Sequence, residues 1–438
     1  MKKLNKKTLS SPTAVDRNLR CCFFECAEDG NTGSIGAHYV VEHARQAGFT
    51  VDVLGACDDR SDYDVELVSV HHCTDWVRLA RTPKHAKVRV IGGHVTIGNP
   101  RPGIPMTDVV CLGEGESWIV EALSRLDQDC RAGALERMRG TIISSDWRCG
   151  NELPSSNFED PLPDNDPYLN RAGTRSSRWY IEIARGCPFR CAYCELGNNI
   201  PYRYYGLNHI KQKLDMIDPR QTRKLNWFAP DEASHPQYVQ LMDELRVRKY
   251  QQAFGSYRVD QVLRRDIVPY SASQLIRIGV DGLTEKTRFR VGKKITNDML
   301  MKYFVKLSQQ GHVQFKMFMI FGYPWEQLED FDEWATLMSH IMHIKVRRSC
   351  WLRVKWTPLI PQVGTPLADV SAKYDIMMVN RIQEWHQQHR QISKHPGWHI
   401  ECDGLMSLAS HGAQVRMTGG DESLFLGKSK YINPAWSI

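Results

Sequence analysis

The sequence predicts an α/β protein in which a doubly wound parallel sheet is followed by a partial, six-unit version of the (β/α)8 barrel. Two observations lead to this prediction. Strand and helix patterns alternate along residues 19–128 and again along residues 173–370. Between the two series, residues 152–167 are rich in proline and aspartate and have no apolar period, which is typical of a linker. Alternating strands and helices favour parallel sheets.

The first series follows a basic tail at residues 1–18 and starts with an apolar, aromatic strand at 19–25. A helix is expected at 33–48, strands at 50–54, 64–70, 88–92 and 108–112, and a helix at 116–126. We assign residues 19–128 to one domain and residues 129–172 to a linker.

The second series supplies the six barrel strands, at 179–184, 224–229, 253–258, 275–280, 313–321 and 351–356. Helices are expected at 237–246, 297–309 and 330–343. The chemistry of such barrels takes place at the carboxyl ends of the strands. Residues 371–438 form a C-terminal extension with a helix at 374–389, which either closes the open side of the barrel or packs on it without further role.

Composition sets the general class. The chain has 438 residues, of which 42% are hydrophobic and 24% are charged, as in soluble globular proteins. No run approaches the ~18 apolar residues that a membrane span needs. Thirteen cysteines without a secretion signal predict reduced thiols in the cytoplasm. The net charge of +7 is compatible with a polyanionic partner but does not identify one.

Three cysteines stand directly after the first barrel strand. Cys187, Cys191 and Cys194 have the spacing C-x3-C-x2-C, with an aromatic residue before the last cysteine. Three thiolates on one loop can hold three irons of a [4Fe–4S] cluster and leave the fourth iron open to a small molecule. The alternatives are a zinc site or unligated buried thiols. Zinc usually needs a fourth ligand and paired C-x2-C motifs, and the chain contains no second such pair.

This loop resembles that of the radical S-adenosylmethionine (SAM) superfamily. The resemblance implies that the amino and carboxylate groups of SAM chelate the open iron. An electron, supplied by a reductant such as flavodoxin or ferredoxin, then cleaves SAM into methionine and a 5′-deoxyadenosyl radical. That radical abstracts an otherwise unreactive hydrogen atom from the substrate.

Further positions of the barrel resemble the same family. Asp231 and Glu232 follow the second strand, where family members bind the SAM amino group. Alternatively, they are an acidic pair at a helix N-terminus. Arg258 stands where a basic residue can pair with a carboxylate, plausibly that of SAM, although a solvent-exposed arginine is the alternative. Gly322 and Pro324 belong to a segment similar to the Gly-x-Pro-Gly-Glu loop, whose backbone approaches adenine.

Other segments add to this resemblance. Trp325 takes the place of the second glycine of that loop, so the adenine contact is expected to differ. The stretch from Gly279 to Asp281 resembles the family's Gly-Ile-Glu motif, and Lys293 and Lys294 follow it. Residues 361–367 resemble the Pro-Gly-Thr-Pro-Leu turn that closes the core.

The N-terminal half resembles the cobalamin-binding domain that precedes the barrel in one large radical SAM subgroup. Residues 90–96 and 108–116 carry the resemblance. Such domains often have Asp-x-His-x-x-Gly after the first strand, with the histidine as cobalt ligand. Here Asn31, Gly33 and Gly36 occupy the corresponding positions, so glycine replaces the ligand. Cobalamin is therefore a candidate cofactor, and a domain that kept only a structural role is the alternative.

Two reactions remain open, of which we favour radical rearrangement without cobalamin. This isomerase hypothesis draws on phage enzymes of similar architecture that rearrange amino-acid-decorated thymidines in DNA, so that a nucleic acid or modified nucleobase is the candidate substrate. The basic, aromatic run at 345–356 could track phosphates and stack bases. Equally, that run could be an amphipathic barrel strand with a charged outer face.

The alternative reaction is carbon methylation, with cobalamin as the methyl donor. A methylthiotransferase is a third and weaker hypothesis. Those enzymes hold a second cluster with three cysteines at strand ends of the N-terminal domain. Cys26 and Cys73 fall near two of those places, but Gly93 occupies the third.

Overall fold

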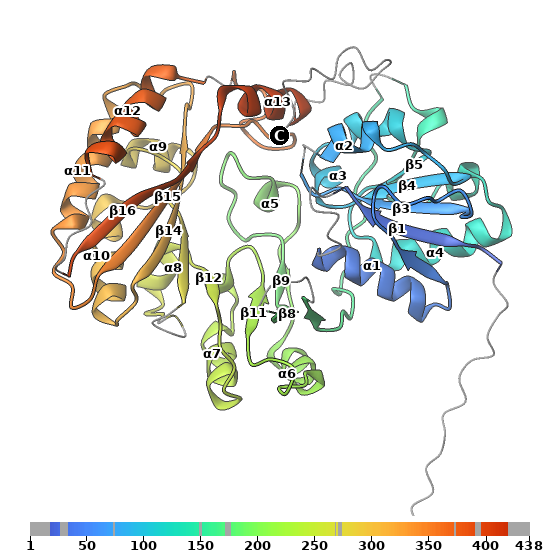
Figure 1. Cartoon of the computed structure of the whole chain (residues 1–438), viewed down its shortest axis with the longest axis horizontal. Helices are drawn as coiled ribbons and strands as arrows, with labels where there is room; N and C mark the ends of the chain where they lie inside the picture. The colour runs from blue at the N-terminus through green and yellow to red at the C-terminus, as the bar shows by residue number, and fades with distance from the viewer. Residues whose placement is uncertain are drawn as a thin grey trace, which may run out of the picture. The chain divides into compact units, whose positions relative to one another are not determined.

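A computed structural model describes residues 18–26, 34–72, 75–148, 151–170, 177–267, 269, 274–371, 374–389 and 396–418 (Figure 1). The chain divides into two compact units. The first comprises Met1–His71, Arg78–Thr96 and Gly103–Asn157, and the second comprises His72–Val77, Ile97–Pro102 and Phe158–Ile438. Of the predicted basic tail at 1–18, all but the last residue lies outside the described part of the chain.

The first unit contains a six-stranded sheet in the order β2-β1-β3-β4-β5-β6. Its strands are β1 Cys21–Glu25, β2 Val51–Val53, β3 Val65–Ser69, β4 Val88–Gly92, β5 Val109–Cys111 and β6 Thr141–Ile143. The first five strands are parallel, in an order found in doubly wound folds of the flavodoxin type. The predicted fold class of this half is confirmed.

Strand β6 lies within the segment that we predicted to be a linker. It runs antiparallel to β5 and places Ile142 and Ile143 in the core. A bridge between Gly113 and Asn157 ties the following residues to the same sheet. The folded unit therefore extends about thirty residues beyond the predicted boundary at residue 128. A three-residue strand is too short to show the two-residue alternation by which strands are recognised.

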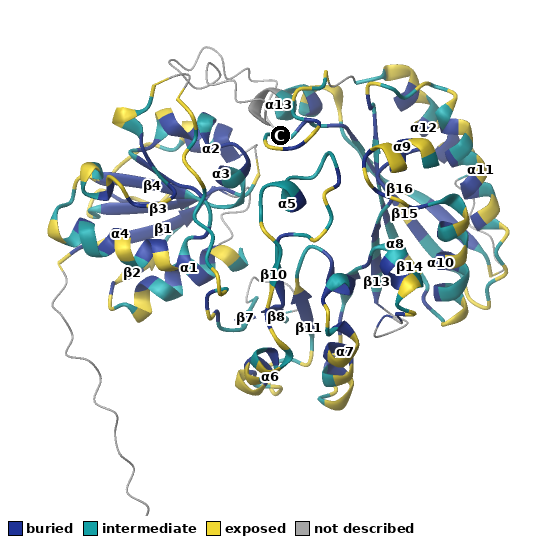
Figure 2. Ribbon diagram, turned by 180° about the vertical axis from the view of Figure 1, so that it is seen from behind, coloured by how far each residue is buried: buried dark blue, intermediate teal, exposed yellow. Residues whose placement is uncertain are grey.

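Helices α1 Ile35–Gln46 and α4 Glu116–Gln128 pack against each other beside this sheet. Helix α1 begins at Ser34, whose Oγ accepts a hydrogen bond from Ala37 N at 3.1 Å. Val41 and Leu123 join Phe23 and Leu67 in the core, and Figure 2 shows the central strands as buried. The shorter helices of this part of the chain are α2 Asp75–Arg81, α3 His94–Gly98, η1 Arg101–Met106, η2 Ala132–Leu135 and η3 Ser144–Asp146.

Three buried charges connect strands β3 and β4 to the loops before them. Glu66 accepts from Arg60 Nε at 3.0 Å and from Arg89 Nε at 2.6 Å, and all three side chains are nearly inaccessible to solvent. The other guanidinium N–H groups donate to backbone carbonyls, including those of Ala56 and Pro83. Each charge is thus paired and hydrogen-bonded, which burial requires.

The second unit contains parallel strands that follow one another in chain order. They are β8 Trp179–Glu182, β11 Leu225–Phe228, β12 Phe254–Ser256, β13 Leu275–Gly279, β14 Gln314–Phe321, β15 Cys350–Pro358 and β16 Trp398–Leu405. β11 pairs with β8, and β12 to β16 form a continuous sheet. An isolated parallel bridge between Lys224 and Gln251 links the two groups. Strands β8 and β11 to β15 are the six strands predicted from the sequence, so the partial barrel is confirmed.

β16 comes from the predicted C-terminal extension and pairs in parallel with β15. The extension therefore adds a seventh parallel strand to the barrel. The sequence pattern gave no signal for it, because its apolar start at Trp398 gives way to the polar residues Glu401 to Gly404. Short antiparallel strands complete this unit, namely β7 Tyr168–Leu169 beside β8 and the pair β9 Ala184–Arg185 and β10 Arg203–Tyr204.

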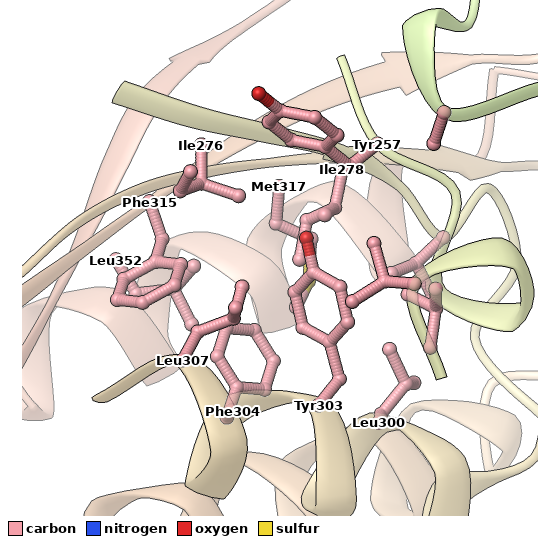
Figure 3. Close-up of a cluster of buried hydrophobic side chains, with 14 of the residues drawn as sticks. Tyr257, Ile276, Ile278, Leu300, Tyr303, Phe304, Leu307, Phe315, Met317 and Leu352 are labelled. Atoms are coloured by element: carbon pink, nitrogen blue, oxygen red, sulfur yellow. The ribbon is translucent and has the colours of Figure 1, made fainter. Parts of the chain in front are cut away.

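Helices cover one face of this sheet (Figure 1). In β14, Phe315, Met317, Met319 and Phe321 are buried, while the residues between them are partly exposed. Figure 3 shows Leu300, Tyr303, Phe304 and Leu307 of α10 facing the buried side chains of β13, β14 and β15. The helices of this unit are α5 Glu195–Asn198, α6 Leu207–Met216, η4 Glu232–Ser234, α7 Tyr238–Val247, α8 Val259–Arg264, α9 Glu285–Arg290, α10 Asn297–Gln309, α11 Asp330–Met342, α12 Ile376–Gln388 and α13 Leu408–Thr418.

Within the described ranges, no helix combines the length and the apolar character needed to cross a bilayer.

Replacing Glu66 by alanine should strongly destabilise the first unit, because two guanidinium groups would be left buried without a carboxylate. We expect the free energy of unfolding to fall by about 3–5 kcal/mol. The matched control is Glu121→Ala, which breaks an exposed pair with Arg125 and should cost less than ~1 kcal/mol. Urea unfolding followed by circular dichroism measures both. Equal effects for the two variants would contradict the role assigned to Glu66.

Candidate functional site

The three cysteines lie on one loop between β9 and α5. The loop starts at Gly186, whose φ of +67° is left-handed and whose Cβ, if present, would lie 2.4 Å from Pro201 O. At the other end, a Cβ on Gly197 would lie 1.8 Å from Phe189 O. Asn198 Nδ2 donates to Cys191 O at 2.9 Å and to Cys194 O at 2.7 Å. Gly186, Gly197 and the Asn198 amide therefore fix the shape of the segment that carries the cysteines. We call residues 186–194 the cysteine loop.

Backbone N–H groups are directed at two of the three sulfurs. Phe189 donates to Cys187, while Leu196 and Gly197 donate to Cys194. Burial outweighs these bonds and raises the pKa of Cys187 to about 11 and that of Cys194 above its ordinary value. A coordinated metal deprotonates a thiol outright. Donors of this kind stabilise sulfurs that carry negative charge, as the cysteines of iron–sulfur clusters do.

Arg258 lies against the middle cysteine. Its Nη1 donates to Cys191 Sγ at 3.6 Å, and its guanidinium lies 3.7 Å from the centre of the Phe189 ring. The carboxylate of Asp260 accepts hydrogen bonds from the other two guanidinium nitrogens, from Nε at 2.9 Å and from Nη2 at 3.3 Å. From the sequence we expected Arg258 to pair with a carboxylate, and we suggested that of SAM. Within the chain the carboxylate partner is Asp260, a residue to which the sequence gave no role.

Asp231 and Glu232 have different surroundings. Asp231 is the N-terminal cap residue of η4, and it accepts from Arg258 N at 3.1 Å and from the hydroxyl of Ser234. It lies near the cysteine loop, because the same Arg258 contacts Cys191 through its guanidinium. Glu232 instead accepts from Gln252 Nε2 at 2.5 Å in the barrel core. Burial raises the pKa of Asp231 and brings that of Glu232 to about 8.

Asp281 connects the cysteine loop to strand β13. Its Oδ2 accepts from the Tyr193 hydroxyl at 2.6 Å and forms an ion pair with Lys293. Its backbone carbonyl accepts from the Tyr323 hydroxyl at 2.9 Å. Asp281 has a left-handed φ of +57°, which aspartate adopts more readily than most residues. The sequence motif drew attention to Asp281 and Lys293, but it did not reveal that they hold Tyr193.

The loop after β14 is held by Glu326. Its Oε2 accepts from Gly322 N at 2.7 Å and from Tyr323 N at 3.2 Å, while Gly322 takes a left-handed φ of +81°. Burial raises the pKa of Glu326 to about 7. Pro324 is exposed at the tip of this loop. The residue Trp325, which replaces a glycine of the family motif, stacks on Tyr323.

The predicted turn at 361–367 lies directly on the cysteine loop. Leu367 N donates to Ala192 O at 3.1 Å, and Asn199 Nδ2 donates to Val363 O at 2.8 Å. Leu367 and Tyr323 also share a small apolar cluster with residues of the cysteine loop. Segments that follow β13, β14 and β15 thus meet at the loop that follows β8, as expected for the carboxyl edge of a parallel barrel.

Within the described residues, no three His, Cys, Asp or Glu side chains converge as ligands of a single ion would. A cuboidal cluster does not need such convergence, because each cysteine binds a different iron. Three thiols on one loop, with N–H donors and one guanidinium beside them, fit such a cluster.

In the first unit, glycines stand at the carboxyl edge of the sheet. Gly93 and Gly113 follow β4 and β5 with φ of +115° and +107°. A Cβ on Gly93 would lie 2.3 Å from Val70 O, and one on Gly113 would lie 2.1 Å from Asn157 O. His71 lies at the same edge, where its Nε2 is 2.9 Å from Ser69 Oγ and 3.3 Å from Glu25 Oε1.

Three positions named from the sequence lie outside the described residues, namely Asn31, Gly33 and Cys73. Gly36 lies in the first turn of α1, and Cys26 is buried directly after β1.

Residues 181–335 match the sequence profile of the Radical SAM superfamily. The match begins within β8 and includes the cysteine loop, η4, Arg258 and the loop after β14. Residues 181–335 form a radical SAM domain. Domains of this family use a [4Fe–4S] cluster and SAM.

Two relatives extend the similarity beyond the barrel. The chain is 21% identical over 417 residues to an uncharacterized protein of Methanocaldococcus jannaschii, a match that covers 91% of this chain and 87% of the relative. It is also 21% identical over 324 residues to the hopanoid C-3 methylase of Methylococcus capsulatus. That match covers 67% of this chain and 58% of the methylase.

Solved structures are similar to this chain over most of its length. The radical SAM methyltransferase TsrM from Kitasatospora setae, solved with cobalamin and a [4Fe–4S] cluster bound, has a TM-score of 0.57 at 14% identity and matches 80% of this chain and 74% of its own. OxsB, a cobalamin-dependent SAM radical enzyme solved with aqua-cobalamin and SAM bound, has a TM-score of 0.56 at 14% identity. That match covers 75% of this chain and 53% of OxsB. The fold is therefore that of radical SAM enzymes with an N-terminal domain resembling cobalamin-binding domains.

Replacing Asp281 by asparagine should loosen the cysteine loop. Asparagine tolerates the left-handed backbone, but it cannot pair with the Lys293 ammonium. Loss of ~1 kcal/mol of local stability would speed amide exchange of residues 187–199 roughly fivefold. Hydrogen–deuterium exchange by mass spectrometry measures this, with Asp298→Asn as the control, because Asp298 forms an exposed pair with Lys302. Unchanged exchange in the Asp281 variant would show that the contact does not hold the loop.

The raised pKa of Glu232 predicts a pH dependence of stability. Between its ordinary value of 4.5 and about 8, the folded chain keeps a proton that the unfolded chain releases. The free energy of unfolding should therefore fall as the pH rises through this window. Glu232→Gln should flatten the dependence, and the exposed Glu329→Gln should not. Urea midpoints at pH 5.5 and 7.5 test this, and identical slopes for the Glu232 variant and the parent would refute it.

Proposed function

We propose that this chain is a cobalamin-dependent radical SAM methyltransferase that acts on an unactivated carbon. The observation that carries the proposal is the cysteine loop, which lies at the carboxyl edge of a partial barrel and follows a doubly wound sheet. The cluster and SAM, bound at the cysteine loop, would supply the 5′-deoxyadenosyl radical. Cobalamin, bound at the doubly wound sheet, would supply the methyl group. We expect the electron to come from flavodoxin or ferredoxin.

The residues of the barrel have distinct proposed roles. Cys187, Cys191 and Cys194 bind the three irons. Asp231 faces SAM, because it accepts from the backbone N of Arg258, whose guanidinium contacts Cys191. Glu232 supports the core through Gln252. Arg258 borders the cluster through Cys191, and the loop containing Gly322 and Pro324 borders SAM.

The first unit is proposed to hold cobalamin at the carboxyl edge of its sheet. Gly93 and Gly113 shape this edge, because the absence of a Cβ lets the backbone of Val70 and of Asn157 lie directly against them. Methyl transfer also agrees with the activities named for the hopanoid C-3 methylase and for TsrM.

The rearrangement that we favoured from the sequence lacks comparable support. None of the reported similarities is to an isomerase or to an enzyme of DNA modification, and those to a methylase, a methyltransferase and a cobalamin-dependent enzyme favour the alternative.

Product analysis after anaerobic reconstitution with iron, sulfide and hydroxocobalamin tests the proposal. Methyl transfer consumes SAM in two ways, so a reductant should yield both 5′-deoxyadenosine and S-adenosylhomocysteine, with about four irons and one cobalt per chain. Cys191→Ala should lose the cluster and 5′-deoxyadenosine. The matched control Cys350→Ala removes a buried thiol elsewhere in the barrel and should retain both. Four irons with 5′-deoxyadenosine but neither cobalt nor S-adenosylhomocysteine would instead favour rearrangement.

A further inference from the structure

Three neighbouring barrel strands present cations side by side. Arg277 of β13 is paired in register with Lys316 of β14, and Lys316 is paired with Arg353 of β15. Glu401 of β16 ends this row. A second cation of β15, Lys355, lies two residues further along the strand, opposite Phe318. We call Arg277, Lys316, Arg353 and Lys355 the cationic row.

The cationic row lies on the sheet face opposite to the helices. Successive side chains of a strand point to opposite faces. The residues that alternate with the row, such as Ile276, Met317 and Leu352, pack on α10 (Figure 3). The run at 345–356 is therefore in part an amphipathic strand, as one reading of the sequence suggested. The two charges of this run that lie within β15, Arg353 and Lys355, are on the inner face of the barrel and not on the predicted outer face.

Like charges directly opposite one another in a sheet are destabilising, so a row of this kind needs counter-charges. β16 supplies two of them. Asp403 pairs with Lys316 at 2.5 Å, and Glu401 lies 3.9 Å from Arg353. β16 thus offers two carboxylates to four cations. Arg277 also interacts electrostatically with the buried Glu232, but within the described part of the chain neither Arg277 nor Lys355 forms an ion pair.

Arg277 and Lys355 are nevertheless held in place. The Arg277 guanidinium lies 3.8 Å from the centre of the Phe254 ring, and burial lowers its pKa. Lys355 lies beside Gly404 of β16, where φ is +121° and a Cβ would come within 2.9 Å of Lys355 Nζ. The pairing of β15 with β16 shifts register here, between Val354 and Trp356. The register shift of β16 and the absence of a side chain at Gly404 leave the space that the Lys355 ammonium occupies.

The row lies on strands β13 to β15, and the segments that follow these strands contact the cysteine loop. Asp281, which holds Tyr193 of that loop, comes four residues after Arg277, or about 13 Å further along the chain at the rise of an extended strand. Lys355 lies two residues nearer to the carboxyl edge than the Arg277–Lys316–Arg353 level. A small molecule bound by the row would therefore extend toward the loop where the radical is generated.

We propose that Arg277 and Lys355 bind the anionic group, a phosphate or a carboxylate, of a small-molecule substrate. The inference rests on the proposed function in one respect, namely that the barrel houses the substrate of the radical reaction. The anion would supply the counter-charge that β16 leaves incomplete. Lys316 and Arg353 would lie beside it, already paired with Asp403 and Glu401.

Isothermal titration of the full-length, anaerobically reconstituted protein with sodium pyrophosphate tests the proposal. Saturable binding is expected, and Arg277→Met or Lys355→Met should each raise the Kd at least ~10-fold, the effect of losing one charge-assisted hydrogen bond. Lys302→Met is the matched control, because Lys302 lies on α10 and is exposed. Lys355→Arg keeps the charge and should retain binding. Glutarate in place of pyrophosphate distinguishes a carboxylate from a phosphate preference, and binding of either supports the site.

Four results would overturn the proposal. They are the absence of saturable binding of both probes, an equal loss in Lys302→Met, displacement of the probe by SAM, and tighter binding of a twelve-nucleotide single strand through the same two residues. The last would assign the row to nucleic acid. Iron content, measured on the same samples, separates this test from that of the proposed function. A protein that contains four irons but binds neither anion would refute the anion-binding role of the cationic row and leave the proposed function standing.

Discussion

The hydrogen bond between Tyr193 and Asp281 is the contact on which the geometry of the candidate site depends. It joins the cysteine loop, which follows β8, to the carboxyl end of β13, three parallel strands further along the barrel. Lys293 balances the charge of the carboxylate, and Tyr323 binds the carbonyl of the same aspartate. Loops from separate strands are thereby fixed around one residue, so the place of the cysteines follows from the barrel and not from the loop alone.

The same principle organises the rest of the barrel. Parallel strands end at a common edge, so each loop after a strand adds a side chain to one region. Arg258 comes from the loop after β12 and contacts Cys191, while the turn after β15 binds Ala192. The buried face of the sheet and the helices on it provide stability. The opposite face is free to carry charge, and it does so at Arg277 and Lys355.

The regular elements could be predicted because their patterns are local. Alternation of apolar residues along β14 and the helical period of α10 are visible in the sequence, and the cysteine spacing identified its own chemistry. Short or irregular pieces could not be predicted, as β6 and β16 show. Partners distant in sequence could not be predicted either. Nothing near Arg258 distinguishes Asp260 from an exposed carboxylate. The contact between Tyr193 and Asp281 is hidden by their sequence separation of 88.

Strand order in the barrel has a consequence for how this unit assembles. From β8 through β16, each new parallel strand joins the edge left by the one before it, so order in space equals order in the chain. A sheet of this kind can grow in the direction of synthesis, since no strand has to be inserted between two that are already paired. In the first unit, order in space does not equal order in the chain, because β3 joins β1 on the side opposite to β2. The strands of the barrel can therefore pair in the order in which they are synthesised, with β16 as the last of those that the structure describes.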